Sequence, residues 1–254
     1  MNVYYIVVLL FIIYMYYIHI YNYSPLYTIA LAAFIAILVM TNKIIKKSNL
    51  NSIDRCSIRY DRDKIYEFDN ILTVDECSKI IDMASPNIKK STVLSTNPNH
   101  PGRTSSHVFL KTNHDLLQKI DNIVYSYLKI PIEHYEDLQV VNYKSTQRYN
   151  AHYDACDPSE EICKQDTDRL GSLRYATFII YLNDNFTGGE TEFPKHNFKA
   201  KPKTGKAVLF FNLNDDNTNR RENSFHGGLP PIVGEKWMCN KWIRLKPIKN
   251  YPNY

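Results

Sequence analysis

The sequence predicts an α+β protein in which short strands close a sandwich or jelly-roll barrel and helices pack on its outside. Beyond about residue 55, two segments with helical spacing come first, and short runs rich in Val, Ile, Phe, Tyr and Leu follow them. Turn signals such as P-K-T-G and P-P-I-V-G separate these runs, as is typical of strands joined by loops. A long apolar segment at the amino terminus is set apart from this domain.

Each predicted element has its own signal in the sequence. Thr73 and Glu76 form a capping box, apolar residues continue at helical spacing, and Pro86 ends this first helix. Residues 114–128 place apolar side chains on one face and predict a second helix, which Pro131 closes. The predicted strands are residues 138–149, 173–182, 206–213 and 236–245.

The amino-terminal segment has the character of a membrane anchor. Residues 3–21 contain no Lys, Arg, Asp or Glu and approach the roughly 20 residues that span a bilayer. A second apolar run, residues 26–40, is shorter, at 15 residues. We expect residues 1–42 to form an anchor, either one span or a hairpin that turns at N-Y-S-P. Residues 43–64 would then be a polar linker, and residues 65–250 a folded domain.

The charges around the anchor predict its orientation. Lys43, Lys46 and Lys47 follow the apolar segment directly, so the positive-inside rule places the folded domain in the cytoplasm. The N-F-T sequon at Asn185 would be used only if that part were lumenal, and it therefore tests the orientation. We expect a protein anchored to the endoplasmic reticulum or another endomembrane, with the side of the membrane left open.

Composition excludes some classes of function and leaves others open. The net charge is +5, but the basic residues are scattered among acids, so no nucleic-acid partner is indicated. The 5 Cys include no C-x-x-C pair, which argues against a zinc site. Cys156 and Cys163 are close enough to form a disulfide in an oxidising compartment, and two free thiols are equally compatible with the sequence. The oligomeric state is not indicated.

A candidate metal site begins with the triplet H-Y-D, residues 152–154. Side chains separated by one residue on a strand point to the same face, so His152 and Asp154 can bind one ion. Among the eight His, His226 is the one in a strand-end context, where Gly227 and Gly228 relax the backbone and a predicted strand follows, which makes it the candidate third ligand. Two imidazoles and one carboxylate are the facial triad of non-haem Fe(II) oxygenases, which leaves positions for a chelating co-substrate and dioxygen.

The co-substrate of this class, 2-oxoglutarate, brings a distal carboxylate that has to be neutralised when it is buried. Lys236 lies ten residues after His226 at the start of the next apolar run, and it is the candidate partner of that carboxylate.

Four sequence blocks, taken in order, resemble the catalytic domain of prolyl 4-hydroxylases of the collagen, plant, algal and large-virus group. The second block reads R-Y-A-T-F-I-I-Y-L-N-D-N-F-T-G-G-E-T-E-F-P, and the fourth contains S-F-H-G-G-L-P-P-I-V-G-E-K-W. The blocks are residues 138–154, 174–194, 201–211 and 224–244, and the resemblance covers roughly residues 65–247. It implies a double-stranded β-helix (jelly-roll) core with flanking helices. It also implies Fe(II), 2-oxoglutarate and ascorbate as cofactors, and proline-rich or collagen-like peptides as substrates.

The resemblance also implies roles for individual residues. His152, Asp154 and His226 would hold the iron, and Lys236 would pair with 2-oxoglutarate. The remaining assignments are Tyr143 and Thr177 as hydroxyl groups that line the 2-oxoglutarate pocket, Trp242 as the aromatic side chain that closes it, and Arg103 as the basic residue of the peptide groove.

The sequence departs from the family pattern in two places. His107 stands where the family has Gly after R-T-S-S, which affects the predicted peptide groove. The insert between Asp154 and Arg174 is long, and we expect a lid or a structural loop there.

Two alternatives to proline hydroxylation remain open at this stage. One is an oxygenase of the same class that acts on peptidyl lysine or a small molecule. The other is a membrane-tethered binding module without turnover, which the intact ligands and Lys236 disfavour.

Overall fold

The computed structural model describes residues 58–62, 64–91 and 102–249. The chain divides into two compact units, residues 1–55 and 56–254, and all described elements belong to the second unit. The predicted membrane anchor lies outside the described residues, as does most of the predicted linker. Within the described part of the chain, no helix has the length and apolar character needed to cross a bilayer.

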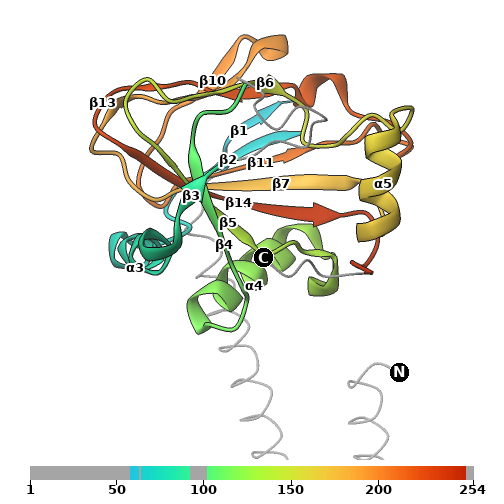
Figure 1. The fold of residues 1–254 in the computed structure, drawn as a ribbon, viewed down its shortest axis with the longest axis horizontal. Coiled ribbons are helices and arrows are strands. Elements are labelled where there is room, and N and C mark those ends of the chain that lie inside the picture. The colour runs from blue at the N-terminus through green and yellow to red at the C-terminus, as the bar shows by residue number, and fades with distance from the viewer. Residues whose placement is uncertain (1–57, 63, 92–101, 250–254) are drawn as a thin grey trace, which may run out of the picture. The chain divides into compact units, whose positions relative to one another are not determined.

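Two antiparallel sheets and a short ribbon form the body of the domain (Figure 1). In spatial order, the larger sheet consists of β1 (Ile58–Arg62), β2 (Ile65–Phe68), β11 (Ala207–Phe211), β7 (Arg174–Tyr181), β14 (Lys236–Arg244), β5 (Leu138–Tyr143), β4 (Ser106–Leu110) and β3 (Lys89–Lys90). The smaller sheet consists of β10 (Phe198–Ala200), β9 (Thr191–Phe193), β12 (His226–Gly228) and β6 (Tyr149–His152). The ribbon pairs β13 (Pro231–Val233) with β8 (Thr187–Gly188). The predicted jelly-roll architecture agrees with these mostly antiparallel sheets.

The central strands β11, β7, β14 and β5 of the larger sheet are buried on both faces. Successive side chains of a strand point to opposite sides, so each strand contributes to two core clusters. Phe178 and Ile180 of β7 join the core cluster that contains the helices. Ile179 and Tyr181 of the same strand join the second cluster, which includes Phe193 of the smaller sheet. The second cluster therefore lies between the sheets and forms the floor of the barrel.

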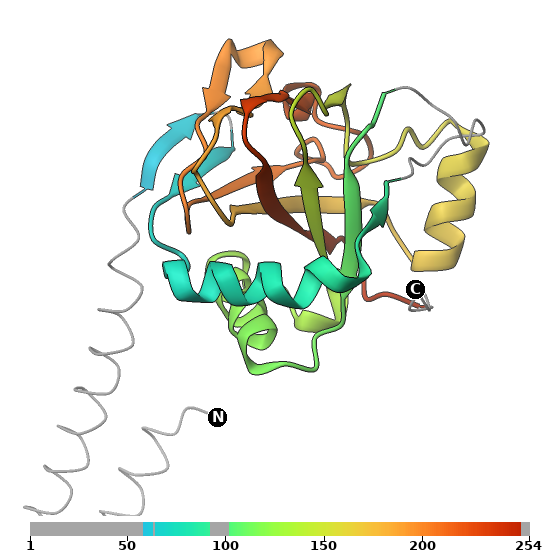
Figure 2. The same ribbon diagram turned by 60° about the vertical axis from the view of Figure 1, so that its left-hand side comes forward.

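Two helices cover the outer face of the larger sheet (Figures 1 and 2). Helix α3 (Val74–Ala84) begins with the predicted capping box, because Thr73 accepts from the Glu76 amide and Glu76 accepts from the Thr73 amide. Helix α4 (Asp115–Leu128) begins at His114, whose ring accepts from the Leu116 amide. Single 3-10 turns cover Ser85–Asn87, Ile132–His134, Pro194–His196 and Glu222–Ser224. Both predicted helices are confirmed.

Three of the four predicted strands match single strands of the structure, and the remaining one, residues 138–149, is divided. The predicted strand 138–149 breaks into β5 and β6 at a turn in which Thr146 has a positive φ of 70°. The division moves residues 149–152 into the smaller sheet, so the chain crosses from one sheet to the other just before the candidate metal ligands.

The insert after Asp154 contains a helix, α5 (Glu161–Leu170), which the sequence did not predict. A disulfide joins Cys156 to Cys163, the first of the two alternatives left by the sequence. The helix ends at Gly171, which has a φ of +99° and where a Cβ would come within 2.9 Å of the Pro247 carbonyl oxygen. The disulfide and the close packing at Gly171 therefore make the insert a structural loop.

A buried ion pair fastens α4 to the sheet. Lys241 of β14 contacts Asp121 of α4 at 2.6 Å, and both side chains are at most 2% exposed. Removing the lysine would leave a carboxylate without its counter-charge in the interior.

We predict that Lys241→Met lowers the free energy of unfolding by roughly 3–5 kcal/mol, because it leaves the Asp121 carboxylate buried without a counter-charge. Urea unfolding followed by circular dichroism measures the change. The double variant Lys241→Met/Asp121→Leu should recover much of the loss. A single variant as stable as the parent would show that the pair carries no such constraint.

Candidate active site

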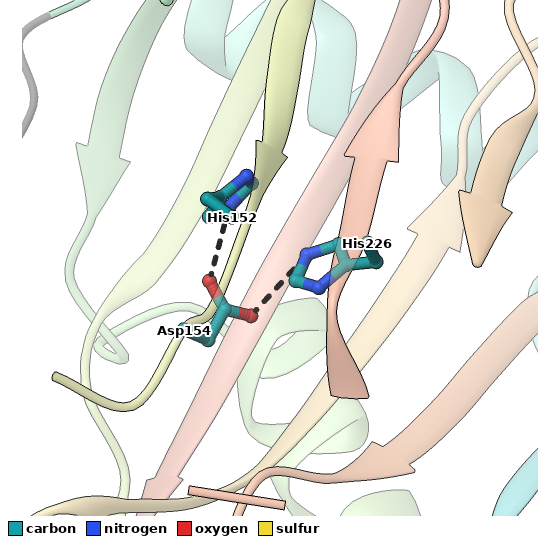
Figure 3. Close-up of side chains that lie close together, drawn as sticks. All are labelled: His152, Asp154 and His226. Atoms are coloured by element: carbon teal, nitrogen blue, oxygen red, sulfur yellow. Dashed lines mark ion pairs between the residues drawn. The ribbon is translucent and has the colours of Figure 1, made fainter. Parts of the chain in front are cut away.

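Three potential metal ligands converge between the smaller sheet and the floor of the barrel (Figure 3). His152 ends β6, Asp154 follows two residues later, and His226 begins the adjacent strand β12, where it pairs directly with His152. One Nε2 atom lies 3.5 Å and the other 3.7 Å from the carboxylate oxygens of Asp154. One ligand atom from each residue lies within 4.8 Å of the others. The register of β6 and β12 therefore creates the site.

Backbone carbonyls fix the orientation of both imidazole rings. His152 Nδ1 lies 2.8 Å from the Asn150 carbonyl oxygen, and His226 Nδ1 lies 2.8 Å from the Ser224 carbonyl oxygen. A carbonyl can only accept, so each Nδ1 carries the proton and each Nε2 lone pair is available to a metal. This donor set fits a divalent transition metal such as Fe(II).

The electrostatics keep Asp154 and His226 in their ligating forms. Burial on its own would raise the pKa of Asp154, but His226 and His152 outweigh it and hold the pKa far below its usual range. Burial lowers the pKa of His226 to about 4, against the opposing effect of Asp154. At neutral pH the carboxylate is therefore ionised and the His226 ring is neutral, as metal binding requires.

Thr177 holds the Asp154 carboxylate in place through its hydroxyl. Its hydroxyl donates to Asp154 at 2.6 Å and accepts from the Asn212 amide at 2.8 Å. Both Thr177 and Asn212 are fully buried. The structure thus gives the Thr177 hydroxyl a partner other than the one predicted, and its contact with 2-oxoglutarate stays a prediction.

A narrow cavity of about 30 Å³ adjoins the ligands on the barrel side. Its lining includes Tyr143, Met238, Trp242 and Arg103. Met238 and Trp242 lie on the inner face of β14, an even number of residues from Lys236. The strand therefore presents them and Lys236 to the same side.

Lys236 is the buried cation of this region. It is fully enclosed, its ammonium donates to the Gly189 carbonyl at 2.7 Å, and it lies 5.1 Å from the centre of the Tyr143 ring. Burial lowers its pKa to about 7, although Glu190 opposes the shift. Tyr143 is its neighbour across the β5–β14 pair, and burial raises the pKa of the Tyr143 phenol. Two of the four predicted 2-oxoglutarate residues, Lys236 and Tyr143, thus lie side by side.

Trp242 forms another wall of the cavity and is held by charged residues. The Arg174 guanidinium stacks 3.6 Å from the centre of its ring. Glu136 in turn binds Arg174 through two hydrogen bonds of 2.8 and 2.7 Å. The indole N–H of Trp242 is buried and has no hydrogen-bond partner among the described residues. A donor in the cavity wall is therefore available to a bound molecule.

Arg103 lies in the cavity wall, whereas the sequence suggested a place in the peptide groove. It is 8% exposed, donates to Ser105 at 3.1 Å and to Gln139 at 3.2 Å, and covers the Tyr149 ring. A direct contact with substrate stays a prediction. His107, the departure from the family pattern, is half-buried on β4, and burial lowers its pKa to about 4, with Arg103 adding to the effect.

Several supporting residues had no usable signal in the sequence. Asn212 reaches Thr177 from 35 positions away, and the carbonyls that orient the rings belong to residues whose side chains play no part. Arg174 stood in the quoted R-Y-A-T block, but nothing in that block indicated Glu136 as its partner.

Two imidazoles and one carboxylate, presented by a jelly-roll beside a buried lysine, define a mononuclear non-haem iron oxygenase. In agreement, residues 138–244 match the model of the 2OG-Fe(II) oxygenase superfamily. A predicted prolyl 4-hydroxylase of Acanthamoeba polyphaga mimivirus is 35% identical over 181 residues, which are 71% of this chain and 74% of that protein. Prolyl 4-hydroxylase 5 of Arabidopsis thaliana is 32% identical and aligns with 72% of this chain and 68% of that protein.

Solved structures agree with these sequence matches. The viral collagen prolyl hydroxylase of Paramecium bursaria Chlorella virus-1, in its 2-oxoglutarate complex, superposes with a TM-score of 0.57 at 28% identity. The match covers 71% of this chain and 96% of the viral one. The chain belongs to the prolyl 4-hydroxylase family, and it is an enzyme that depends on Fe(II) and 2-oxoglutarate.

We predict that Thr177→Val lowers the affinity for Fe(II) by roughly 10–100-fold, because the Asp154 carboxylate loses the hydroxyl that orients it. Thr177→Ser keeps the hydroxyl and serves as the matched control. Anaerobic titration of the metal-free protein with Fe(II), followed by calorimetry, measures both. Equal affinities for Thr177→Val and the parent would remove Thr177 from the account of the metal site.

Proposed function

We propose that this enzyme hydroxylates peptidyl proline at C4 in proline-rich or collagen-like chains, with succinate and carbon dioxide as co-products. The observation that carries the proposal is the pairing of the His152–Asp154–His226 cluster with a fully buried lysine on the neighbouring sheet. The relatives named as prolyl 4-hydroxylases and the viral collagen prolyl hydroxylase support this choice of substrate.

The chain's own residues would divide the work as follows. His152 and His226 present their Nε2 atoms and Asp154 its carboxylate to the iron, which with 2-oxoglutarate bound supplies the oxidation of the C–H bond by dioxygen. Lys236 would exchange the Gly189 carbonyl for the distal carboxylate of 2-oxoglutarate. Trp242 would close the cavity to water and offer its indole N–H to the bound co-substrate. Ascorbate is the reductant typical of this family.

We further propose that residues 1–42 anchor the enzyme to an endomembrane. Their length and lack of charged residues support this proposal. The Cys156–Cys163 disulfide favours a lumenal domain, whereas Lys43, Lys46 and Lys47 favour a cytoplasmic one.

The proposed reaction is tested with proline-rich and Pro-Pro-Gly peptides in the presence of Fe(II), 2-oxoglutarate and ascorbate. We expect one oxygen to be added per modified proline, with matching succinate, and no product from His152→Ala. Peptide mass spectrometry locates the oxygen. Succinate formation driven by lysine peptides and not by proline peptides would replace the proposed substrate, and iron binding without succinate would contradict an oxygenase.

The pKa of Lys236 predicts how 2-oxoglutarate affinity varies with pH. Only the ammonium form can pair with the carboxylate, and in the free enzyme its pKa is about 7. Affinity should therefore be constant below this pH and fall above it by about tenfold per pH unit, until the pKa of the complex is reached.

The dissociation constant of 2-oxoglutarate is measured on Mn(II)-loaded protein between pH 6 and 9. Lys236→Arg stays cationic across this range, so its binding, even if weaker, should not depend on pH. Parallel pH profiles for the parent and Lys236→Arg would exclude Lys236 as the titrating partner.

A further inference from the structure

A groove of about 290 Å³ extends from His152 and Asp154 along the insert. We call it the insert groove, and its lining comprises Gly102, residues 149–157, Glu160, Ile162 and Arg220. We infer that the insert groove receives the substrate residues that flank the target proline and that Glu160 gives it a preference for lysine or arginine there. This inference rests on the proposed function.

The groove is continuous with the site of reaction. Tyr149, His152 and Asp154 line both the insert groove and the small cavity beside the ligands. The cavity, at about 30 Å³, has no room for a polypeptide, whereas the insert groove, at about 290 Å³, can hold peptide residues next to the ligands. The groove is therefore where residues that flank the target proline can lie.

The wall of the groove is built to keep its shape. The Cys156–Cys163 disulfide ties the loop after Asp154 to α5. Arg220 binds Asp157 at 2.8 Å and lies 4.6 Å from the centre of the Tyr153 ring. These contacts hold the insert against the segment that leads to β12. A wall fixed in advance costs little ordering entropy when a peptide binds.

The wall of the insert groove carries a negative charge, that of Glu160, without a paired cation among the described residues. Arg220 is balanced by Asp157. Glu160 is exposed, lines the groove, and its carboxylate has no hydrogen bond or ion pair among the described residues. A cationic substrate side chain in the groove would supply the missing counter-charge. Glu161, the next residue, is not part of the lining and pairs with Lys164 at 3.6 Å.

The test uses the full enzyme and a set of proline-rich peptides that differ only in having Lys, Gln or Glu at one position near the target proline, moved along the peptide. At the position that enters the groove, we expect KM for the Lys peptide to be roughly two- to five-fold below that for the Glu peptide. The preference should shrink as salt is added, and kcat and KM for 2-oxoglutarate should stay constant.

Glu160→Lys should reverse the peptide preference, whereas the matched variant Glu161→Lys, with the same charge change at the start of the same helix, should leave it as it is. If both variants keep the parent preference, or if no charge preference exists at any position, the inference is wrong while proline hydroxylation stands. If no peptide is hydroxylated by the parent enzyme, the proposed function fails and the inference fails with it.

Discussion

The structure depends on one electrostatic constraint: a carboxylate is buried between two imidazoles that must both present Nε2 to it. An ionised group so enclosed is tolerated only when it is paired and hydrogen-bonded. The β6–β12 register brings His152 opposite His226, backbone carbonyls orient the rings, and Thr177 holds Asp154. The three ligand atoms are therefore already oriented to receive a dication, whose charge would offset that of the carboxylate.

Strand β14 links this site to the rest of the domain. Its inner face carries Met238 and Trp242, which line the cavity, and Lys236, which lies against Tyr143 of that lining. Its outer face carries Lys241, which is paired with Asp121 of α4. Because side chains alternate along β14, its two buried lysines, Lys236 and Lys241, lie on opposite faces of the sheet. Lys241 is paired with a carboxylate, whereas Lys236 donates its hydrogen bond to a backbone carbonyl and lies against Tyr143, so its charge is free to pair with a bound carboxylate.

The sequence was a good guide where a local pattern decided the outcome. The capping box at Thr73, the amphipathic spacing of α4, and the triplet around His152 each predicted what the structure contains. It was a poor guide where distant residues decide. Helix α5 has few buried apolar residues and is held by the disulfide and by Arg244, which reaches Asp166 at 2.9 Å from the far end of the chain. Nor could spacing show that Thr177 supports Asp154, because the contact arises only when β7 passes beneath the loop after β6.

The central claim is that His152, Asp154 and His226 hold one iron ion and that 2-oxoglutarate chelates this ion beside Lys236. Anaerobic addition of 2-oxoglutarate to the Fe(II)-loaded enzyme tests it most directly, since chelation of Fe(II) by a 2-keto acid gives a visible charge-transfer band. The account predicts one equivalent of chromophore per chain, none with Asp154→Ala, and a band that needs far more 2-oxoglutarate with Lys236→Met. A chromophore of unchanged intensity and affinity in both variants would contradict it.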